Sequence, residues 1–239
     1  MSLHEDFTRH GKMADLGRWY VTGFVRSVAG ELPEGVRVLD AGAGECVYKS
    51  FFSHCRYTAV DLGVGDSSWN YGNLDVIAAL HRMGLESDRF DAVLCTQVLE
   101  HLELPAESLV EIHRVLRPGG KLYLTAPMSH PQHQQPYDFF RYTSFGLQSL
   151  LIRAGFSKVT VEPFGGMFIR WAYELPRALA VIPGAGLVAG KINWAGVALL
   201  PLKFAAKLFV PLAQRLCLFL DRFEKEKDDP FGWAVVAEK

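Results

Sequence analysis

The sequence predicts an α/β protein built around one doubly wound, largely parallel β-sheet. Short apolar runs recur between residues 36 and 162 and alternate with stretches at helical spacing, which is typical of parallel βαβ units. A glycine-rich turn directly follows the first of these runs. The 239-residue chain is 49% hydrophobic and 21% charged, so it has the apolar content for a buried core that disordered and fibrous chains lack.

The elements of this fold follow in order along the chain. A helix is predicted over residues 12–30, because apolar side chains from Leu16 to Val28 recur at helical spacing, and Gly30 ends it. Seven strands are predicted at 36–39, 57–60, a short stretch ending near 74–75, 90–95, 121–126, 158–162 and 233–237, with helices at about 106–116 and 144–154 and a turn at 118–120.

A long apolar insert separates the sixth strand from the last. Of the 43 residues from Ala178 to Leu220, 30 are hydrophobic, and the segment contains four basic residues and no acid. Within it, 203–220 is predicted to form a basic amphipathic helix, which Pro211 could kink or divide. Three interpretations stay open: peripheral membrane contact through 178–220, packing inside the protein, and an oligomer contact. Asp221–Asp229 is expected to be a solvated linker.

Three regions are therefore predicted. Residues 1–35 would form an N-terminal helical cap, 36–166 with 231–239 the sheet domain, and 167–230 the apolar and basic helical insert.

Composition and charge exclude some classes of partner and location. The net charge of −1 provides no basic field, so a nucleic-acid partner is not expected. The four cysteines are scattered and form no CxxC pair, which favours a reduced, cytoplasmic compartment, with membrane association as an option. The first ten residues are polar and include Glu5 and Asp6, unlike a signal peptide. No run reaches the roughly 18 uncharged apolar residues of a spanning helix.

The glycine turn carries the strongest chemical signal. Asp40-Ala-Gly-Ala-Gly44 follows the first strand and is expected to lead into a helix, so that backbone N–H groups face a ligand. The dinucleotide pattern G-x-G-x-x-G is absent, because Val47 occupies its third position. A carboxylate at Asp40 would repel phosphate and attract a cationic group such as an ammonium. Asp61, 21 residues later at the end of the next strand, is placed to bind ribose hydroxyls.

These pieces resemble the class I S-adenosylmethionine (SAM)-dependent methyltransferases of the methyltransferase type 11 group. The resemblance extends over about residues 36–165 and the final strand. It implies a Rossmann-like seven-stranded sheet with an antiparallel last strand, and SAM as the cofactor. The matching segments are Val38-Leu-Asp-Ala-Gly-Ala-Gly44, Tyr57-Thr-Ala-Val-Asp61, Phe90-Asp-Ala-Val-Leu-Cys-Thr-Gln-Val-Leu-Glu-His101 and Glu111-Ile-His-Arg-Val-Leu-Arg-Pro-Gly-Gly120.

The resemblance assigns a cofactor role to ten positions. One group would hold the methionyl part of SAM, another its ribose, a third its adenine, and a fourth would line the pocket beside the sulfonium. The chain departs from many relatives at Glu45-Cys46, where they have a third glycine, and Asn73 is a rival to Asp75 for the adenine. The residues are Asp40, Gly42 and Gly44 for the methionyl part, Asp61 for the ribose, Asp75 for the adenine, Thr96 and Gln97 beside the sulfonium, and Glu45, Leu62 and Val76 next to these positions.

The polar and aromatic segment 126–143 follows the fifth strand and supplies the catalytic candidates. His133, and after it His130, could deprotonate an acceptor hydroxyl, and Tyr142 could orient the acceptor or the cofactor. The same histidines with Asp138 could instead bind a metal, although no metal is expected, or Asp138 and Arg141 could form a purely structural pair. Since methyl transfer can run on proximity alone, no dedicated base is required.

Glu100-His101 admits a catalytic interpretation with Glu as acceptor and His as base, but the resemblance favours a structural signature. The sequence therefore predicts a SAM-dependent methyltransferase acting on a small-molecule or lipid-linked acceptor. The alternative is a non-catalytic SAM-fold module that binds a membrane or a protein. A nicotinamide-dependent oxidoreductase is disfavoured by Asp40 and by the missing third glycine.

Overall fold

The computed structural model describes residues 16–65, 68–188 and 191–239. The start of the first predicted helix and residues 1–15 of the predicted N-terminal cap, which include Glu5 and Asp6, lie outside the described residues. The described chain divides into two units. The larger consists of Arg18–Phe164 and Gly232–Lys239, and the smaller of Gly165–Phe231 with Leu16 and Gly17.

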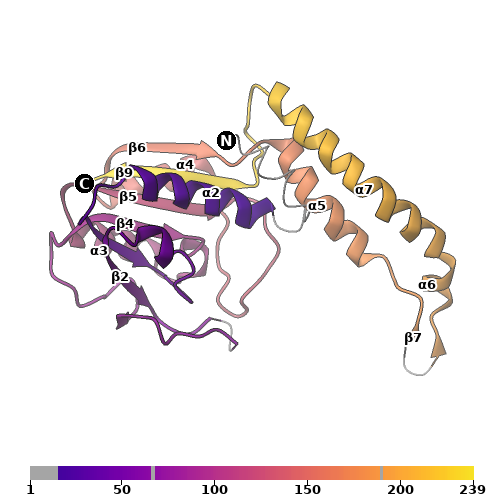
Figure 1. Cartoon of the computed structure of the whole chain (residues 1–239), viewed down its shortest axis with the longest axis horizontal. Coiled ribbons are helices and arrows are strands. Elements are labelled where there is room, and N and C mark those ends of the chain that lie inside the picture. Colours follow the sequence, from indigo (N-terminus) through magenta and orange to yellow (C-terminus); the bar gives the residue numbers. More distant parts are fainter. Residues whose placement is uncertain (1–15, 66–67, 189–190) are drawn as a thin grey trace. The chain divides into compact units, whose positions relative to one another are not determined.

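The larger unit is built on a seven-stranded sheet (Figure 1). All its neighbouring strands pair in parallel except β9, which is antiparallel to both β5 and β6. This confirms the predicted doubly wound sheet with an antiparallel last strand. The strands are β1 (Arg37–Ala41), β2 (Arg56–Asp61), β3 (Val76–Ile77), β4 (Phe90–Thr96), β5 (Leu116–Pro127), β6 (Ser157–Pro163) and β9 (Gly232–Glu238), in the order β3-β2-β1-β4-β5-β9-β6.

The strand order reverses between β1 and β4, which lie side by side at the centre of the sheet. In open α/β sheets, ligands bind at the carboxyl ends of the strands at this switch point. The strand order therefore places the carboxyl ends of β1 and β4 next to each other. The glycine turn follows β1 and Thr96 ends β4, so they lie at the same edge of the sheet.

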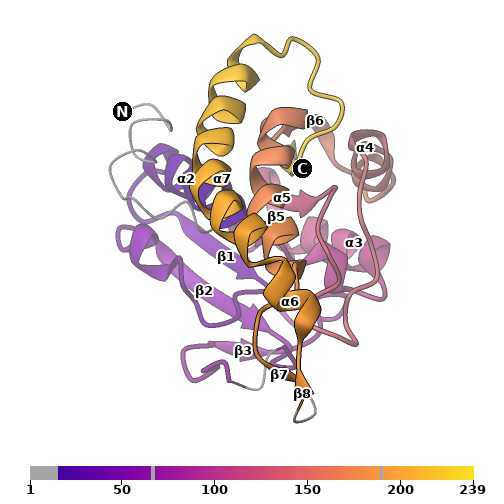
Figure 2. The same cartoon turned by 90° about the vertical axis from the view of Figure 1, so that its right-hand side faces the viewer.

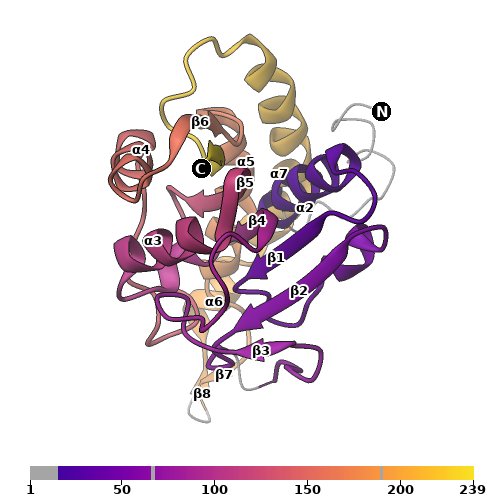
Figure 3. The same ribbon diagram turned by 90° about the vertical axis from the view of Figure 1, so that its left-hand side faces the viewer.

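Helices cover both faces of this sheet (Figure 3). On one face, α3 (Pro105–Val115) and α4 (Ser144–Arg153) bury Leu109, Ile112 and Leu147 against strand residues. On the other, α2 (Leu16–Glu31) places Phe24 with its ring centre 6.5 Å from that of Tyr123. Because strand side chains alternate between faces, Leu122 and Leu124 join the first core while Tyr123 faces α2.

Two local predictions in this unit were wrong, and a third holds in part. The third strand begins after Asp75 rather than ending near it. The glycine turn leads into further turns and the short 3₁₀ helix η1 (Lys49–Phe52), not a full helix, because Cys46 has a positive φ of 59° that interrupts helical geometry. The predicted turn at 118–120 lies within the bounds of β5, where the register jumps from Phe90–Leu116 to Ala92–Lys121 and Gly119 has a φ of 75°.

The smaller unit holds the insert. Its helices α5 and α7 lie side by side (Figures 1 and 2) and are linked by the Gln214 side-chain amide, which donates to the Ala172 carbonyl at 2.8 Å. Pro211 lies within one continuous helix, and the β7–β8 hairpin was not predicted. The elements are α5 (Met167–Val181), β7 (Leu187–Val188), β8 (Lys191–Ile192), α6 (Trp194–Ala198), α7 (Leu200–Leu220) and η3 (Asp221–Phe223). Among the described helices, none is long and apolar enough to cross a membrane.

The expectation of a solvated linker at Asp221–Asp229 holds for exposed residues such as Lys225 and Glu226, but three acids of this segment bind the start of α5. Asp221 is buried, and its Oδ1 accepts the Gly166 N–H at 2.8 Å. Glu224 accepts the N–H of Met167 at 2.8 Å, and Arg170 pairs with Asp229 at 2.7 Å. The first N–H groups of a helix have no partner within it, so carboxylates at this end of α5 satisfy them and complement the helix dipole.

Candidate functional site

The glycine turn between β1 and η1 depends on two positive φ angles. Gly42 has φ 88° and Gly44 has φ 52°. A Cβ on Gly42 would lie 2.4 Å from Val98 Cγ2, so only glycine fits there without movement. The N–H groups of Gly42 and Ala43 both donate to the Val60 carbonyl, at 2.8 and 3.1 Å, which holds the turn against the end of β2.

Asp61, the last residue of β2, fixes the turn from the other side. Its Oδ2 accepts the Gly44 N–H at 2.9 Å, and its Oδ1 accepts the Gly63 N–H at 2.8 Å. Each carboxylate oxygen has two lone pairs, so both oxygens keep acceptor capacity for ligand hydroxyls. One side chain therefore shapes the turn and still offers acceptors to a ligand.

Asp40, the fourth residue of β1, is only 2% exposed. Its Oδ2 accepts the hydroxyl of Tyr57, a partner that the sequence did not suggest. Burial raises the pKa of Asp40 to about 7, although the Tyr57 hydrogen bond opposes the shift, and the charge of Asp61 raises it further. A cation bound near this carboxylate would favour its charged form.

Two other predicted acids bind backbone. The exposed Glu45 accepts the Asn70 N–H at 3.0 Å through Oε1. Asp75 accepts the Ala59 N–H at 2.8 Å through Oδ2, which ties the start of β3 to β2. Leu62, beside Asp61, is exposed and Val76 opens β3. These residues lie along the same strand ends as Asp40 and Asp61.

Thr96 and Gln97 lie at the carboxyl end of β4. Gln97 has a positive φ of 54°, and its backbone N–H donates to the Thr125 carbonyl at 3.0 Å. Its side-chain amide donates to the Thr125 hydroxyl at 3.1 Å, so β5 fixes its direction. The predicted cofactor residues thus gather at the carboxyl ends of β1, β2 and β4 and at the start of β3, while their individual roles stay predictions.

Trp69 belongs to this region and was missed. A Cβ on Gly44 would come 3.3 Å from Trp69 Cζ3, so the ring lies over the glycine turn. Its ring centre is 6.2 Å from that of Tyr71. The only available signal was an aromatic pair inside an otherwise polar loop, because the loop has no periodicity that could place it.

The loop after β5 is held by an ion pair. Asp138 takes two hydrogen bonds from Arg141, at 2.7 and 2.9 Å, and a third from the His133 N–H at 2.9 Å. The guanidinium holds the pKa of Asp138 well below its usual range. Arg141 also donates to the carbonyls of His130 and Pro131, at 2.8 and 2.9 Å. The predicted Asp138–Arg141 pair is confirmed, and the side chain of Thr143 caps α4.

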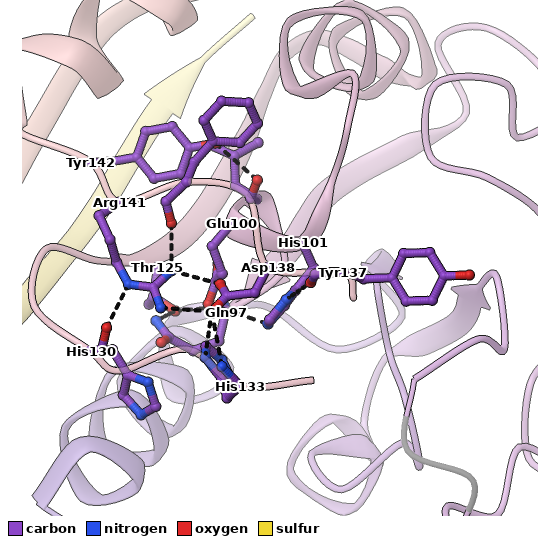
Figure 4. A network of polar contacts seen from close by, with 12 residues as sticks. Gln97, Glu100, His101, Thr125, His130, His133, Tyr137, Asp138, Arg141 and Tyr142 are labelled. Carbon is purple, nitrogen blue, oxygen red and sulfur yellow. Dashed lines mark hydrogen bonds and ion pairs between the residues drawn. The ribbon is translucent and has the colours of Figure 1, made fainter. Parts of the chain in front are cut away.

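This pair does not leave Asp138 available for the metal site considered with His130 and His133. The structure instead brings His133 to Glu100 and His101 (Figure 4). The His101 and His133 ring centres are 4.6 Å apart in an edge-to-face arrangement. His101 Nε2 lies 3.8 Å from Glu100 Oε1.

Glu100 is 0% exposed, and neither of its carboxylate oxygens has a hydrogen-bond partner. Burial raises its pKa to about 8, although its own backbone and the charge of Arg141 oppose the shift. Burial also lowers the pKa of His101. A buried carboxylate beside two imidazoles is a chemically unusual group, which the sequence interpretation had treated as a structural signature.

Tyr142 lies in the core, and its hydroxyl donates to the Leu99 carbonyl at 2.9 Å. Its own carbonyl accepts the Trp233 indole N–H at 2.9 Å. These contacts favour a structural role in holding the loop beside Glu100. The proposal that Tyr142 orients an acceptor stays a prediction, as does a base role for His133.

Comparisons with known proteins agree with this fold. Residues 39–124 match the family model of the methyltransferase domain Methyltransf_11. A ubiquinone biosynthesis O-methyltransferase of Xanthomonas oryzae pv. oryzae is 32% identical over 112 residues, which is 38% of this chain and 43% of that protein. An uncharacterized 37.1 kDa protein in transposon TN4556 of Streptomyces fradiae is 30% identical over 105 residues, which is 37% of this chain and 30% of that protein. The matches thus span less than half the length of these curated relatives.

A solved structure of a SAM-dependent methyltransferase from Archaeoglobus fulgidus has the same fold. It matches with a TM-score of 0.57 and 16% identity, over 93% of this chain and 95% of that chain. Residues 39–124 therefore match the model of a methyltransferase domain, and the chain has the Rossmann-like fold of the class I SAM-dependent methyltransferases. The resemblance predicted from the sequence motifs is confirmed.

Gly42→Ala tests the glycine turn. The positive φ alone costs roughly 1–2 kcal/mol for an L-residue, and the contact with Val98 should add about 1–3 kcal/mol. Gly84→Ala is the matched control, because Gly84 has φ 68° and open space where a Cβ would lie. Urea unfolding should show a larger loss in the free energy of unfolding for Gly42→Ala than for Gly84→Ala. Adding Val98→Ala to Gly42→Ala should restore part of that loss. Equal losses for the two single variants would contradict the steric account.

Proposed function

We propose that the chain binds SAM at the ends of β1, β2 and β4 and acts as a methyltransferase. The observation that carries this proposal is the hydrogen bond from the Gly44 N–H to Asp61, inside the segment that matches a methyltransferase domain. The residues present suit this cofactor. Carboxylates Asp40 and Asp61 would attract its positive charge and accept from its hydroxyls, whereas they would repel a pyrophosphate.

When bound, SAM supplies a methyl group on a sulfonium sulfur, and its transfer to an acceptor leaves S-adenosylhomocysteine. The protein's part is to orient the reactants. Asp61 would hold the ribose, and Thr96 and Gln97 would border the reacting sulfur, with Gln97 fixed by Thr125. An acceptor hydroxyl must also lose its proton, either to His133, when its Nε2 binds no ion, or to solvent.

We propose a small-molecule acceptor that is methylated on oxygen. Support comes from the curated relatives named ubiquinone biosynthesis O-methyltransferase, of which one from Azotobacter vinelandii is 26% identical over 117 residues. The alternative of a non-catalytic binding module gains no support from the comparisons.

Asp61→Asn tests the cofactor site. The amide keeps the size of the side chain but loses the charge and half of its acceptors, so SAM affinity should fall about 10- to 100-fold, as for a charged hydrogen bond. Calorimetry on the full chain measures this. Asp88→Asn is the control, because Asp88 pairs with Lys239 before β4, at the opposite end of that strand. Unchanged affinity in Asp61→Asn, or no binding by the wild type, would contradict the assignment.

We further propose that α7 contacts an anionic lipid surface, which would suit a lipid-linked acceptor. Gln214 and Cys217 are buried on the side of α7 that faces α5, and the large apolar side chains lie elsewhere on the helix. Exposed large apolar side chains lie on α7 together with Lys203, Lys207 and Arg215, and the helix contains no acid, which supports the proposal. The exposed apolar side chains include Leu202, Phe204, Leu208, Phe209, Leu212, Leu216 and Phe219.

Flotation with vesicles tests this contact. The full chain should float with vesicles rich in phosphatidylserine and less with neutral vesicles, because each Lys or Arg near an anionic surface adds on the order of 1 kcal/mol to the binding free energy. Replacing Lys203 and Lys207 by Glu should reduce flotation several-fold, whereas Lys225→Glu, on an exposed residue outside α7, should not. An absence of flotation together with a dimer in light scattering would favour the oligomer interpretation and overturn this one.

A further inference from the structure

The polar group at Glu100 has features that the methyltransferase fold does not explain. Both Glu100 carboxylate oxygens and His101 Nε2 are buried without a hydrogen-bond partner. A buried polar atom left without a partner is costly, and native structures rarely retain one without a ligand, an ion or a water. Three such atoms in adjacent residues indicate that something binds among them.

The hydrogen bonds of the two imidazoles define which nitrogen faces this point. His101 Nδ1 contacts the Tyr137 carbonyl, which can only accept, so Nδ1 carries the proton and Nε2 presents a lone pair. His133 Nδ1 lies 3.1 Å from the Pro131 carbonyl and 3.4 Å from Asp138 Oδ2, and both are acceptors. The same reasoning leaves the lone pair of His133 on Nε2. Metal-binding histidines typically have this arrangement, with the second nitrogen donating to a carbonyl or carboxylate.

The distances are short enough for one ion. One ligand atom from each of Glu100, His101 and His133 lies within 4.8 Å of the other two. Ligands at about 2.0–2.2 Å from an ion are roughly 3–3.5 Å from each other, so small side-chain rotations would close the site. The ring of His133 lies on a loop that Asp138 and Arg141 hold in place, while Glu100 and His101 lie on the 3₁₀ helix η2 (Leu99–His101) (Figure 4).

We propose that Glu100, His101 and His133 bind a divalent first-row transition ion such as Zn²⁺. Two imidazole nitrogens and one carboxylate oxygen form a set that such ions prefer, whereas Mg²⁺ prefers oxygen ligands. This proposal differs from the sequence expectation that no metal is bound. Three protein ligands leave at least one coordination position open, as catalytic metal sites do.

An open position has a consequence that rests on the proposed function. Gln97, predicted to border the reacting sulfur, lies three residues before Glu100 and in the same polar network (Figure 4). An acceptor hydroxyl coordinated to the ion would be more acidic and held in place. The ion would thus select acceptors with a hydroxyl that can bind a metal.

Metal binding by the full chain tests the proposal without SAM or acceptor. After removal of metal with a chelator, the wild type should bind one Zn²⁺ in competition with a chromophoric chelator, and Mg²⁺ should bind far more weakly. Glu100→Gln and His133→Asn should each weaken Zn²⁺ binding by at least the roughly 10- to 100-fold that is typical when groups supporting a ligand are lost. Glu103→Gln and His81→Asn, at exposed positions, are the matched controls and should bind as the wild type does.

Two measurements keep this test decisive. Circular dichroism confirms folding of Glu100→Gln, and His133→Asn provides a second variant at a half-buried loop position if the buried change disrupts the fold. Co²⁺ replaces Zn²⁺ to report the ligands, and the proposal predicts a spectrum without a thiolate band. Absence of tight binding, binding unchanged in both variants, tighter Mg²⁺ than Zn²⁺ binding, or a thiolate band from a cysteine would each overturn the proposal. Because SAM is absent, none of these results bears on the cofactor assignment.

Discussion

The hydrogen bonds from Gly44 and Gly63 to Asp61 join the loops after β1 and β2 at the candidate cofactor site. Two parallel strands end side by side, and their following loops would otherwise leave backbone N–H groups without partners. The carboxylate of Asp61 accepts one N–H from each loop, at 2.9 and 2.8 Å. This contact sets the conformation of the glycine turn, and the turn in turn determines where Val98 and Trp69 can lie. The geometry of the candidate cofactor site follows from this one side chain.

The two buried acids near the strand ends differ in how they are compensated. Asp40 has a hydrogen bond from Tyr57, and Glu100 has none from any described residue. Burial raises the pKa of both, because a charged carboxylate loses hydration there. Each is therefore destabilising as an isolated anion and would be stabilised by a cation: an organic cation near Asp40 and, as we propose, a metal ion at Glu100. The site thus combines two adjacent regions that favour positive charge.

The sequence was sufficient to predict the fold because strands β1, β4 and β9 are buried on both faces and give continuous apolar runs. The glycine turn at Asp40–Gly44 could be predicted because turn chemistry is local in the sequence, and Asp61 because it ends an apolar run. The tie of Tyr57 to Asp40 and the Trp69 ring over Gly44 could not be predicted, since they join residues 17 and 25 positions apart without a periodic pattern. His133 meets Glu100 and His101 only after the loop beyond β5 folds back, and that path depends on Asp138 and Arg141. The capping role of Glu224 was missed because its charge-rich surroundings are typical of a solvated segment.

The affinity for SAM as a function of pH tests the central claim that buried acids at the strand ends bind a cationic cofactor. The pKa of Asp40 is raised to about 7, so this side chain is neutral at lower pH and charged at higher pH. Binding of a cation favours the charged form, so affinity should rise as pH increases from about 5.5 to 7 and then level off. The slope should approach about tenfold per pH unit for one linked proton. In Asp40→Asn the affinity for SAM should be low and should not change with pH. Calorimetry that shows pH-independent affinity in the wild type, or no binding across this range, would contradict the account.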